Sequence, residues 1–208
     1  MGDHVYTYID PPNERHLEQI CSSLEKGDVL VLPMEHSWAF CCDATSRKGI
    51  MVMYGLKPEH SKKHPFSLVC ADIAMASSMT NIDGQTYSVL RKLLPGAYTI
   101  ILKSARNLPK LLKDKREKVG IRIPNEKITL AILERYGKPL AATTVPKGRD
   151  GSILQMGYQI YDEFGHAVSI VVDLGLELSG LESTILDMSA DDIELVREGA
   201  GPIDILGF

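Results

Sequence analysis

Two basic side chains stand at positions where the chain could bind an anion. Lys57 follows a segment, 46–56, with helical spacing of apolar residues, and its ammonium could neutralise a phosphate as a point charge. The alternative is an ordinary solvated lysine. Arg122 lies between two isoleucines in the run GIRIP, and an arginine inside a short apolar strand usually has a fixed anionic partner. We favour a ligand carboxylate as this partner over the structural alternatives Glu35 and Glu182.

Hydroxyl groups mark the ends of two other predicted strands. They belong to Thr143, Thr144, Ser183 and Thr184. Hydroxyls and free N–H groups at strand ends are good donors to phosphates and carboxylates, although each such residue taken singly is more often an ordinary strand or turn residue. Arg197 is the single base of the acidic C-terminal segment, where it either pairs with the acids or reaches a phosphate.

Basic and acidic residues are segregated along the chain. Between 47 and 149 there are 20 Lys or Arg against 7 Asp or Glu, whereas 162–208 holds 11 acids and one base. A basic middle segment can form a positive surface for phosphates or nucleic acid even in a chain of formal net charge −4. The alternative is that these lysines and arginines only solvate helix faces.

Alternating predicted strands and helices carry these polar residues. The β-branched run 29–32 is typical of a buried strand, and Pro33 should end it, so that 34–38 leaves the sheet. Helices are predicted at 14–26, 46–56, 71–79, 84–94 and 126–136, and the N-caps expected for the first, fourth and fifth of these are Asn13, Asp83 and Asn125. Further strands are predicted at 66–70, 98–102, 119–123, 140–145, 169–174, 183–187 and 193–197.

This alternation predicts an α/β fold with one sheet. The last three strands follow one another without helices, so the sheet should mix parallel and antiparallel pairs. The chain of 208 residues contains no internal repeat or linker, and we expect one domain over 13–208 after an N-terminal extension over 1–12. Ligands bind at the carboxyl ends of strands in such sheets. The stretch 146–165, part loop and part helix, leaves open whether a lid closes over that edge.

Composition and motifs exclude several classes of protein. No run approaches about 20 apolar residues, so no membrane span is expected. The four cysteines lack CxxC spacing and the chain start does not resemble a signal peptide, which favours a reducing cytoplasm. There is no P-loop, GxGxxG or GxSxG motif. No metal site is predicted either, because His60 and His64 stand among lysines that repel a dication.

Seven pieces of sequence, taken in order, carry a family resemblance. They are VLVLPMEHSWAFCCDA, MYGLKPEHSKKHPFSLV, LLPGAYTIILK, VGIRIPN, KPLAATTV, ESTILD and VREGAGPI, between about residues 13 and 202. The chain resembles the YrdC/YciO family, which comprises L-threonylcarbamoyladenylate synthases and their YciO relatives. The pieces FSLVCADI and LLPGAYTIILK are more similar to YciO.

The resemblance implies a twisted mixed sheet flanked by helices, with a concave, positively charged cavity. In the synthases, that cavity condenses threonine, bicarbonate and ATP, with Mg2+, into an intermediate for tRNA modification. The resemblance assigns catalytic roles to Lys57 and to Arg122, the latter as the arginine that holds the threonine carboxylate. The residues it implies for nucleotide binding are Lys57, Thr143, Ser183, Thr184 and Arg197.

The sequence departs from the synthase pattern at three motifs. The second base of the KxR motif is Glu59, and the asparagine of the SxN motif is Val145. Both hydroxyls of the usual Pro-Thr-Asp/Glu-Thr turn are lost in 33–36. A charge-assisted hydrogen bond is worth roughly 1.5–3 kcal/mol, so even one loss costs about one to two decades of affinity. Efficient synthase activity is therefore not expected.

Three hypotheses follow for the function. The first is a YciO-like protein whose basic cavity binds nucleotide or structured RNA, either tRNA or double-stranded RNA, with weak or no synthase activity. The second is an active synthase in which His36, Lys62 or Lys63 replaces the missing groups. The third is a sensor or partner subunit that keeps the fold without the chemistry.

Overall fold

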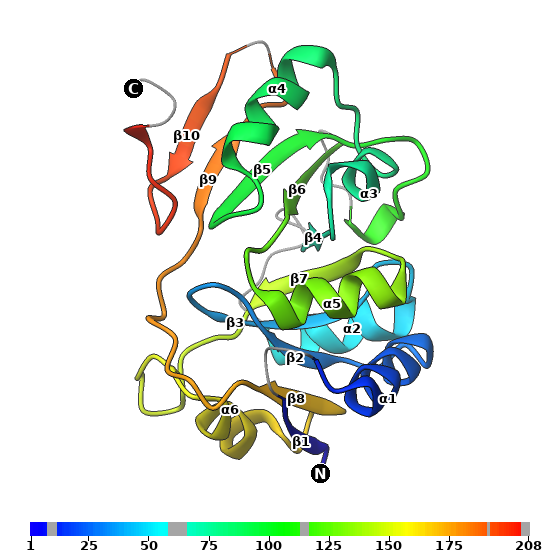
Figure 1. The fold of residues 1–208 in the computed structure, drawn as a ribbon, viewed down its shortest axis with the longest axis vertical. Coiled ribbons are helices and arrows are strands. Elements are labelled where there is room, and N and C mark those ends of the chain that lie inside the picture. Colours follow the sequence, from blue (N-terminus) through cyan, green and yellow to red (C-terminus); the bar gives the residue numbers. More distant parts are fainter. Residues whose placement is uncertain (8–11, 58–65, 113–116, 191, 205–208) are drawn as a thin grey trace.

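One mixed β-sheet runs through the length of the molecule (Figure 1). The computed structural model describes residues 1–7, 12–57, 66–112, 117–190 and 192–204. Over these residues ten strands form the sheet, in the order β1-β8-β2-β3-β7-β4-β6-β5-β9-β10. The strands are β1 (Asp3–Tyr6), β2 (Leu30–Pro33), β3 (Trp38–Asp43), β4 (Ser67–Val69), β5 (Tyr98–Lys103), β6 (Lys118–Arg122), β7 (Leu140–Thr144), β8 (Ile170–Asp173), β9 (Thr184–Asp187) and β10 (Glu194–Arg197).

The sheet contains both parallel and antiparallel pairs, which confirms the predicted α/β class and mixed sheet. The pairs β1·β8, β2·β8, β4·β6 and β5·β9 are parallel, and the others are antiparallel. The helices are α1 (Glu14–Glu25), α2 (Arg47–Leu56), α3 (Ile73–Ser77), α4 (Gly84–Leu93), α5 (Lys127–Tyr136) and α6 (Gly157–Phe164), with a 3-10 turn η1 at Lys110–Leu112.

Capping side chains determine where the helices begin. Asn13 Oδ1 accepts backbone N–H groups in the first turn of α1, and Asp83 does the same for α4, as predicted. The predicted cap of α5 was wrong by one residue, because Glu126 rather than Asn125 precedes the helix and accepts its free N–H groups. Gly137, with φ of +71°, ends α5 because glycine adopts this left-handed conformation without a Cβ penalty.

Two strands depart from the sequence-based expectations. Trp38 does not leave the sheet as predicted: it begins β3 and pairs with Pro33, and the backbone N–H of Met34 closes the tight turn onto Ser37 O at 2.8 Å. All six residues of β3 are buried, so the strand lacks the alternating pattern that marks a half-exposed strand. β1 lies within the segment taken as an extension, and it pairs with β8 at one edge of the sheet.

The two faces of the sheet carry separate apolar cores. The first core takes buried side chains from α2, α3, α4 and α6, and the second takes them from α1 and α5. On the sheet, the second core includes residues of β1, β8, β2, β3, β7 and β4, but none of β6, β5 or β9. Figure 1 shows α1 and α5 beside the half that contains β2, β3 and β7. Among the described residues, no helix packs on this second face over β6, β5 and β9. No helix among the described residues has the length and apolar character needed to cross a membrane.

Candidate anion-binding site

A cavity of about 230 Å³, hereafter the cation cavity, lies on the second face, between the half that α1 and α5 cover and the half that contains β6, β5 and β9. Strand alternation produces it, because one row of residues faces the first core and the next row faces the cavity. The row in the core consists of Leu68, Ile121, Ile100 and Leu186. The row in the cavity consists of Ser67, Arg122, Thr99 and Ile185. The site is therefore built on central strands rather than on loops.

Gly120 keeps the floor of this cavity open. A Cβ at this position would lie 2.9 Å from Ser67 Oγ and 3.0 Å from Thr99 Cγ2, closer than such atoms normally approach. Both of those side chains line the cation cavity. A larger residue at position 120 would therefore push into the space that a ligand needs.

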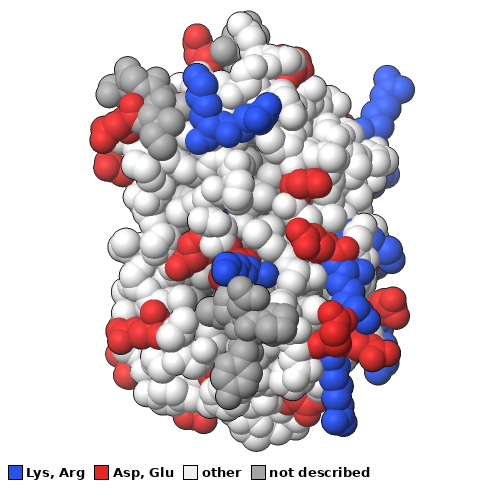
Figure 2. Space-filling view, in the orientation of Figure 1, with Lys and Arg blue, Asp and Glu red and all other residues white. Residues whose placement is uncertain are grey.

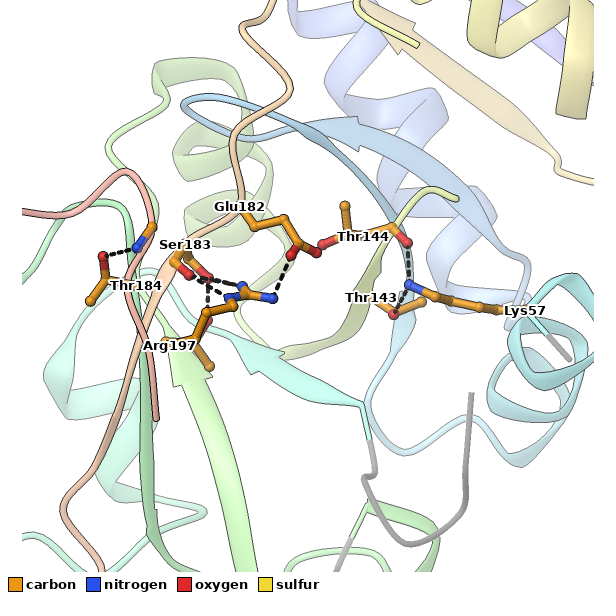
Figure 3. Close-up of polar contacts among 9 residues, drawn as sticks. Lys57, Thr143, Thr144, Glu182, Ser183, Thr184 and Arg197 are labelled. Carbon is orange, nitrogen blue, oxygen red and sulfur yellow. Dashed lines mark hydrogen bonds and ion pairs between the residues drawn. The ribbon is translucent and has the colours of Figure 1, made fainter. Parts of the chain in front are cut away.

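Lys57 reaches the cavity from the end of α2. Its backbone N–H caps the helix at Met53 O, 3.1 Å away, so the side chain projects from a fixed point. Its ammonium donates to Thr144 O at 2.9 Å and to Thr143 Oγ1 at 3.4 Å (Figure 3). The structure thus brings Lys57 and Thr143 together, as predicted from their places at the end of a helix and of a strand.

Arg122 has a structural partner, the alternative that the sequence analysis did not favour. Its Nη2 donates to Glu35 Oε2 at 3.2 Å, and each of the two side chains is only 9% exposed. Glu35 Oε1 also accepts the backbone N–H of Asn125 at 2.7 Å, which fixes the carboxylate. Burial lowers the pKa of the Arg122 guanidinium, whereas the Glu35 carboxylate acts to raise it. The Nε of Arg122 is buried and has no hydrogen-bond partner in the described part of the chain, and the side chain lines the cation cavity.

Arg197 enters the cavity from β10 on the opposite side from Lys57 (Figure 3). Its Nε and Nη2 donate to Ser183 O at 3.2 and 2.8 Å, and its Nη1 forms an ion pair with Glu182 Oε2 at 2.6 Å. The Ser183 hydroxyl lies 2.8 Å from Thr99 Oγ1. Glu182 was considered as a partner for Arg122, but the structure pairs it with Arg197.

Thr184, in contrast, is not among the residues that line the cavity. Its side chain points to the other face of β9 and is fully buried. Its hydroxyl donates to Gly201 O at 2.6 Å and accepts the backbone N–H of Gly199 at 3.0 Å. Thr184 therefore attaches the C-terminal segment to the sheet, and the ligand role predicted for it does not match its position.

A second cavity of about 280 Å³, the apolar cavity, adjoins the first and shares Thr144 and Glu182 with it. Its other lining residues are Ser37, Trp38, Val145, Pro146, Lys147, Ile153, Leu154 and Gly180. The Trp38 Nε1–H donates to Gln155 O at 3.2 Å, and the backbone N–H of Leu178 donates to the same oxygen at 2.9 Å. The loop before α6, considered as a lid, thus forms one wall of this cavity.

A larger hollow elsewhere in the described residues is a weaker candidate. It has a volume of about 880 Å³ and lies between α3, the start of α4 and the end of β9. Its lining has one basic residue, Lys103, and one acidic residue, Asp83, which caps α4. In the cation cavity, by contrast, Lys57, Arg122 and Arg197 converge. Three converging cations are the stronger sign of an anion site.

Comparisons with known proteins agree with this architecture. The family model described as telomere recombination (Sua5, YciO and YrdC) matches residues 22–199. The chain belongs to this family. YciO of Escherichia coli K12, a protein described as uncharacterized, is 27% identical over 204 residues, which are 98% of each chain. The crystal structure of E. coli YciO superposes with a TM-score of 0.90 over 99% of both chains.

Synthase relatives are more distant or share only the fold. A putative threonylcarbamoyl-AMP synthase of Methanocaldococcus jannaschii is 26% identical over 202 residues, covering 97% of this chain and 94% of that protein. The structure of P. abyssi Sua5 complexed with L-threonine has a TM-score of 0.86 at 18% identity, covering 99% of this chain and 59% of the other. That likeness concerns the fold alone.

Two of the three departures from the synthase pattern lie among the described residues, and the third lies outside them. Met34 is fully buried in the second core, and His36 Nδ1 lies 3.3 Å from Ser179 Oγ, so neither replaces a hydroxyl in the cation cavity. Val145 lines the apolar cavity. Glu59, Lys62 and Lys63 lie outside the described residues, and so do His60 and His64.

Sequence reasoning missed the roles of Ser67 and Thr99. Both line the cation cavity, Ser67 as the first residue of β4 and Thr99 as the second residue of β5, and the residues that follow them in each strand are mainly apolar. A polar residue at one alternate position of a buried strand is a usable signal, because the interior favours apolar side chains there. The signal is weak in each strand alone, and it becomes informative only when the strand pairing puts the two residues on one face.

Proposed function

We propose that this chain binds a phosphorylated nucleotide across the two adjoining cavities, with weak or no threonylcarbamoyl-AMP synthase activity. The observation that carries the proposal is the convergence of Lys57, Arg122 and Arg197 on one small cavity. A cavity with three cations suits phosphate oxygens, because the hydrogen bonds they accept there are charge-assisted. The neighbouring apolar cavity, with Trp38, Val145 and Pro146 in its walls, suits a nucleobase.

The reduced synthase activity is inferred from how the cations are already engaged. The Arg122 guanidinium, which would hold the threonine carboxylate, has the Glu35 carboxylate within 3.2 Å. Val145 provides no amide where the synthases have asparagine, and Met34 provides no hydroxyl. Threonine would therefore find fewer fixed donors than in a synthase, and a ligand carboxylate would add a second negative charge beside Glu35.

ATP with Mg2+ is the nucleotide that the family resemblance implies. The described residues contain no group of three or more His, Cys, Asp or Glu side chains placed to hold a metal ion. Phosphate oxygens and water commonly provide most ligands of Mg2+ in nucleotide sites. We therefore expect any magnesium to be carried by the nucleotide, while Lys57, Arg122 and Arg197 neutralise the remaining phosphate charge. The four free thiols fit action in a reducing cytoplasm.

Pyrophosphate release from ATP and Mg2+, measured with threonine and bicarbonate together and then each alone, tests the activity. Nucleotide binding is measured in parallel by isothermal titration calorimetry. We expect binding that weakens at least about tenfold in Lys57→Ala, because one charge-assisted contact is worth about 1.5–3 kcal/mol. We expect no release above background. Release that requires both threonine and bicarbonate, and is lost in Arg122→Ala, would instead make the chain an active synthase.

Structured RNA is the second ligand class proposed from the sequence. Figure 2 shows Lys and Arg interspersed with Asp, Glu and uncharged residues on one face, so the described residues of this face form no continuous basic surface. A free nucleotide is therefore the better-supported ligand. Binding of transfer or double-stranded RNA would be recognised by a steep loss of affinity as salt rises, because phosphate contacts release counterions.

A further inference from the structure

We propose that Glu182 is an internal competitor for the anion site. Its carboxylate occupies the Nη1 donor of Arg197, and a phosphate that binds Arg197 there must displace it. This inference rests on the proposed nucleotide function and specifies what limits affinity there. Glu182 lines both the cation cavity and the apolar cavity. In Figure 3 it projects from the loop before β9 toward Arg197 and lies on the side facing Thr144.

Arg197 keeps its orientation without Glu182. Its Nε and Nη2 donate to Ser183 O at 3.2 and 2.8 Å, and its Nη2 also lies 3.5 Å from Ser183 Oγ. These contacts hold one edge of the planar guanidinium against the backbone. The Glu182 carboxylate is bonded to the remaining nitrogen, Nη1, at 2.6 Å. A phosphate that replaces this carboxylate would thus meet a donor that is already positioned.

Glu182 is also able to leave at low cost. Its side chain is 51% exposed, and among the described residues Arg197 is the partner of its carboxylate. Its backbone is fixed independently, because Glu182 O accepts the N–H of Ala200 at 2.8 Å. An exposed ion pair of this kind contributes little to stability, so a rotamer change that moves the carboxylate into water loses little.

Glu35, the other carboxylate beside the cations, behaves differently. It is 9% exposed and makes a second contact to the backbone N–H of Asn125, so it stays in place when a ligand arrives. The cavity therefore has a fixed carboxylate on Arg122 and a displaceable one on Arg197. With Glu182 bound, three cations face two carboxylates, and with Glu182 displaced they face one. A small anion of low charge gains little from the exchange, whereas a pyrophosphate group gains an oriented guanidinium.

The test is the affinity of inorganic pyrophosphate, and of ATP without magnesium, for the full chain and for Glu182→Gln at low ionic strength. Glutamine keeps the size of the side chain and removes its charge. We expect about tenfold tighter pyrophosphate binding in Glu182→Gln, since a like charge a few ångströms from the ligand is removed at a partly solvated site. The gain should disappear in the double variant Glu182→Gln/Arg197→Gln.

Glu14→Gln is the matched control. Glu14 forms an exposed ion pair with Arg135 at 2.7 Å on the α1/α5 side of the protein and lines neither cavity. The affinity of the Glu14→Gln variant for pyrophosphate should equal that of the unmodified chain. Equal affinity of the unmodified chain and Glu182→Gln for pyrophosphate, or weaker binding by the variant, would overturn the competitor role and leave the proposed nucleotide function intact.

Two other outcomes separate the proposals. If neither the unmodified chain nor Glu182→Gln binds pyrophosphate or ATP, both the competitor role and the nucleotide function are wrong. If only Glu182→Gln binds, the competitor role is supported in its strongest form, in which the carboxylate keeps the resting site closed. Circular dichroism and the melting temperature of each variant confirm that the compared proteins are folded.

Discussion

Replacing Glu35 by alanine should destabilise this protein far more than the loss of an ordinary ion pair. Glu35 and Arg122 are each 9% exposed, and no described residue forms a hydrogen bond with the guanidinium Nε. Removal of the carboxylate leaves a buried arginine charge, and arginine does not lose its proton in proteins. It also removes the acceptor of the Asn125 backbone N–H, which lies 2.7 Å from Glu35 Oε1.

The expected loss is about 3–5 kcal/mol, the usual cost of removing one partner from a buried ion pair. For a domain of this size, about 2–4 °C of melting temperature corresponds to each kcal/mol, so the midpoint should fall by about 6–20 °C. Glu14→Ala is the comparison, because the Glu14 and Arg135 side chains are 78% and 42% exposed although their N–O distance is only 2.7 Å. That variant should lose less than about 1 kcal/mol.

Urea unfolding followed by circular dichroism measures both losses under the same conditions. The double variant Glu35→Leu/Arg122→Met should recover much of the stability, because it removes both charges and keeps apolar volume in the site. If Glu35→Ala and Glu14→Ala lose the same free energy, burial does not control the strength of the pair and the reasoning fails. A double variant no more stable than Glu35→Ala would contradict it in the same way.

Three further predictions concern acid stability, the cavity floor and the thiols. Burial favours the neutral acid of Asp187, but hydrogen bonds from Lys118 and Ser189 lower the pKa of this carboxyl group overall. The stability that the Asp187 carboxylate gives to the folded protein is therefore present at neutral pH and lost as the pH falls below about 4. Asp187→Asn should therefore flatten the decline in urea midpoint between pH 7 and pH 3. An unchanged decline would exclude the ion pair of Lys118 and Asp187 as a cause of the acid sensitivity. Gly120→Val should weaken nucleotide binding in calorimetry at least severalfold, because its side chain would collide with Ser67 and Thr99, whereas unchanged affinity would place the ligand elsewhere. A thiol reagent should modify Cys21, which is partly exposed, well before the buried thiols, and equal rates would refute this. Burial raises the pKa of each buried thiol, to about 12 for two of them; the three are Cys41, Cys42 and Cys70.

The class of the fold and most of its elements could be predicted from sequence because their signals are local. Caps such as Asn13 and Asp83, and the apolar runs of β5 and β6, act over a few residues. β3 was not predicted because its run WAFCCD, unlike the run of β2, contains no β-branched residue and follows Pro33, which was expected to direct 34–38 out of the sheet. β1 was missed because its burial depends on β8, a strand from the other end of the chain.

The site was partly predictable because local signals identify the elements that carry some of its residues. Lys57, Thr143 and Arg197 could be placed near a cavity because each follows or lies in a predicted element at the relevant edge. Ser183 and Thr184 were not distinguishable, since adjacent strand residues point to opposite faces and only the pairing with β5 decides which faces the cavity. The partners of the two arginines, Glu35 and Glu182, also depend on long-range pairing that no local pattern encodes.

The position of β7 in the sheet has a consequence for how this domain folds. The chain builds β2 and β3 on one side, crosses to β4, β5 and β6 on the other, and only then returns to insert β7 between β3 and β4. β8 then goes back to the first side, and β9 and β10 go to the second. Neither half is therefore a continuous piece of polypeptide, and a single proteolytic cut should not release a stable half. Because the cation cavity takes side chains from both halves, a ligand bound there should raise the stability of the whole domain as one cooperative unit.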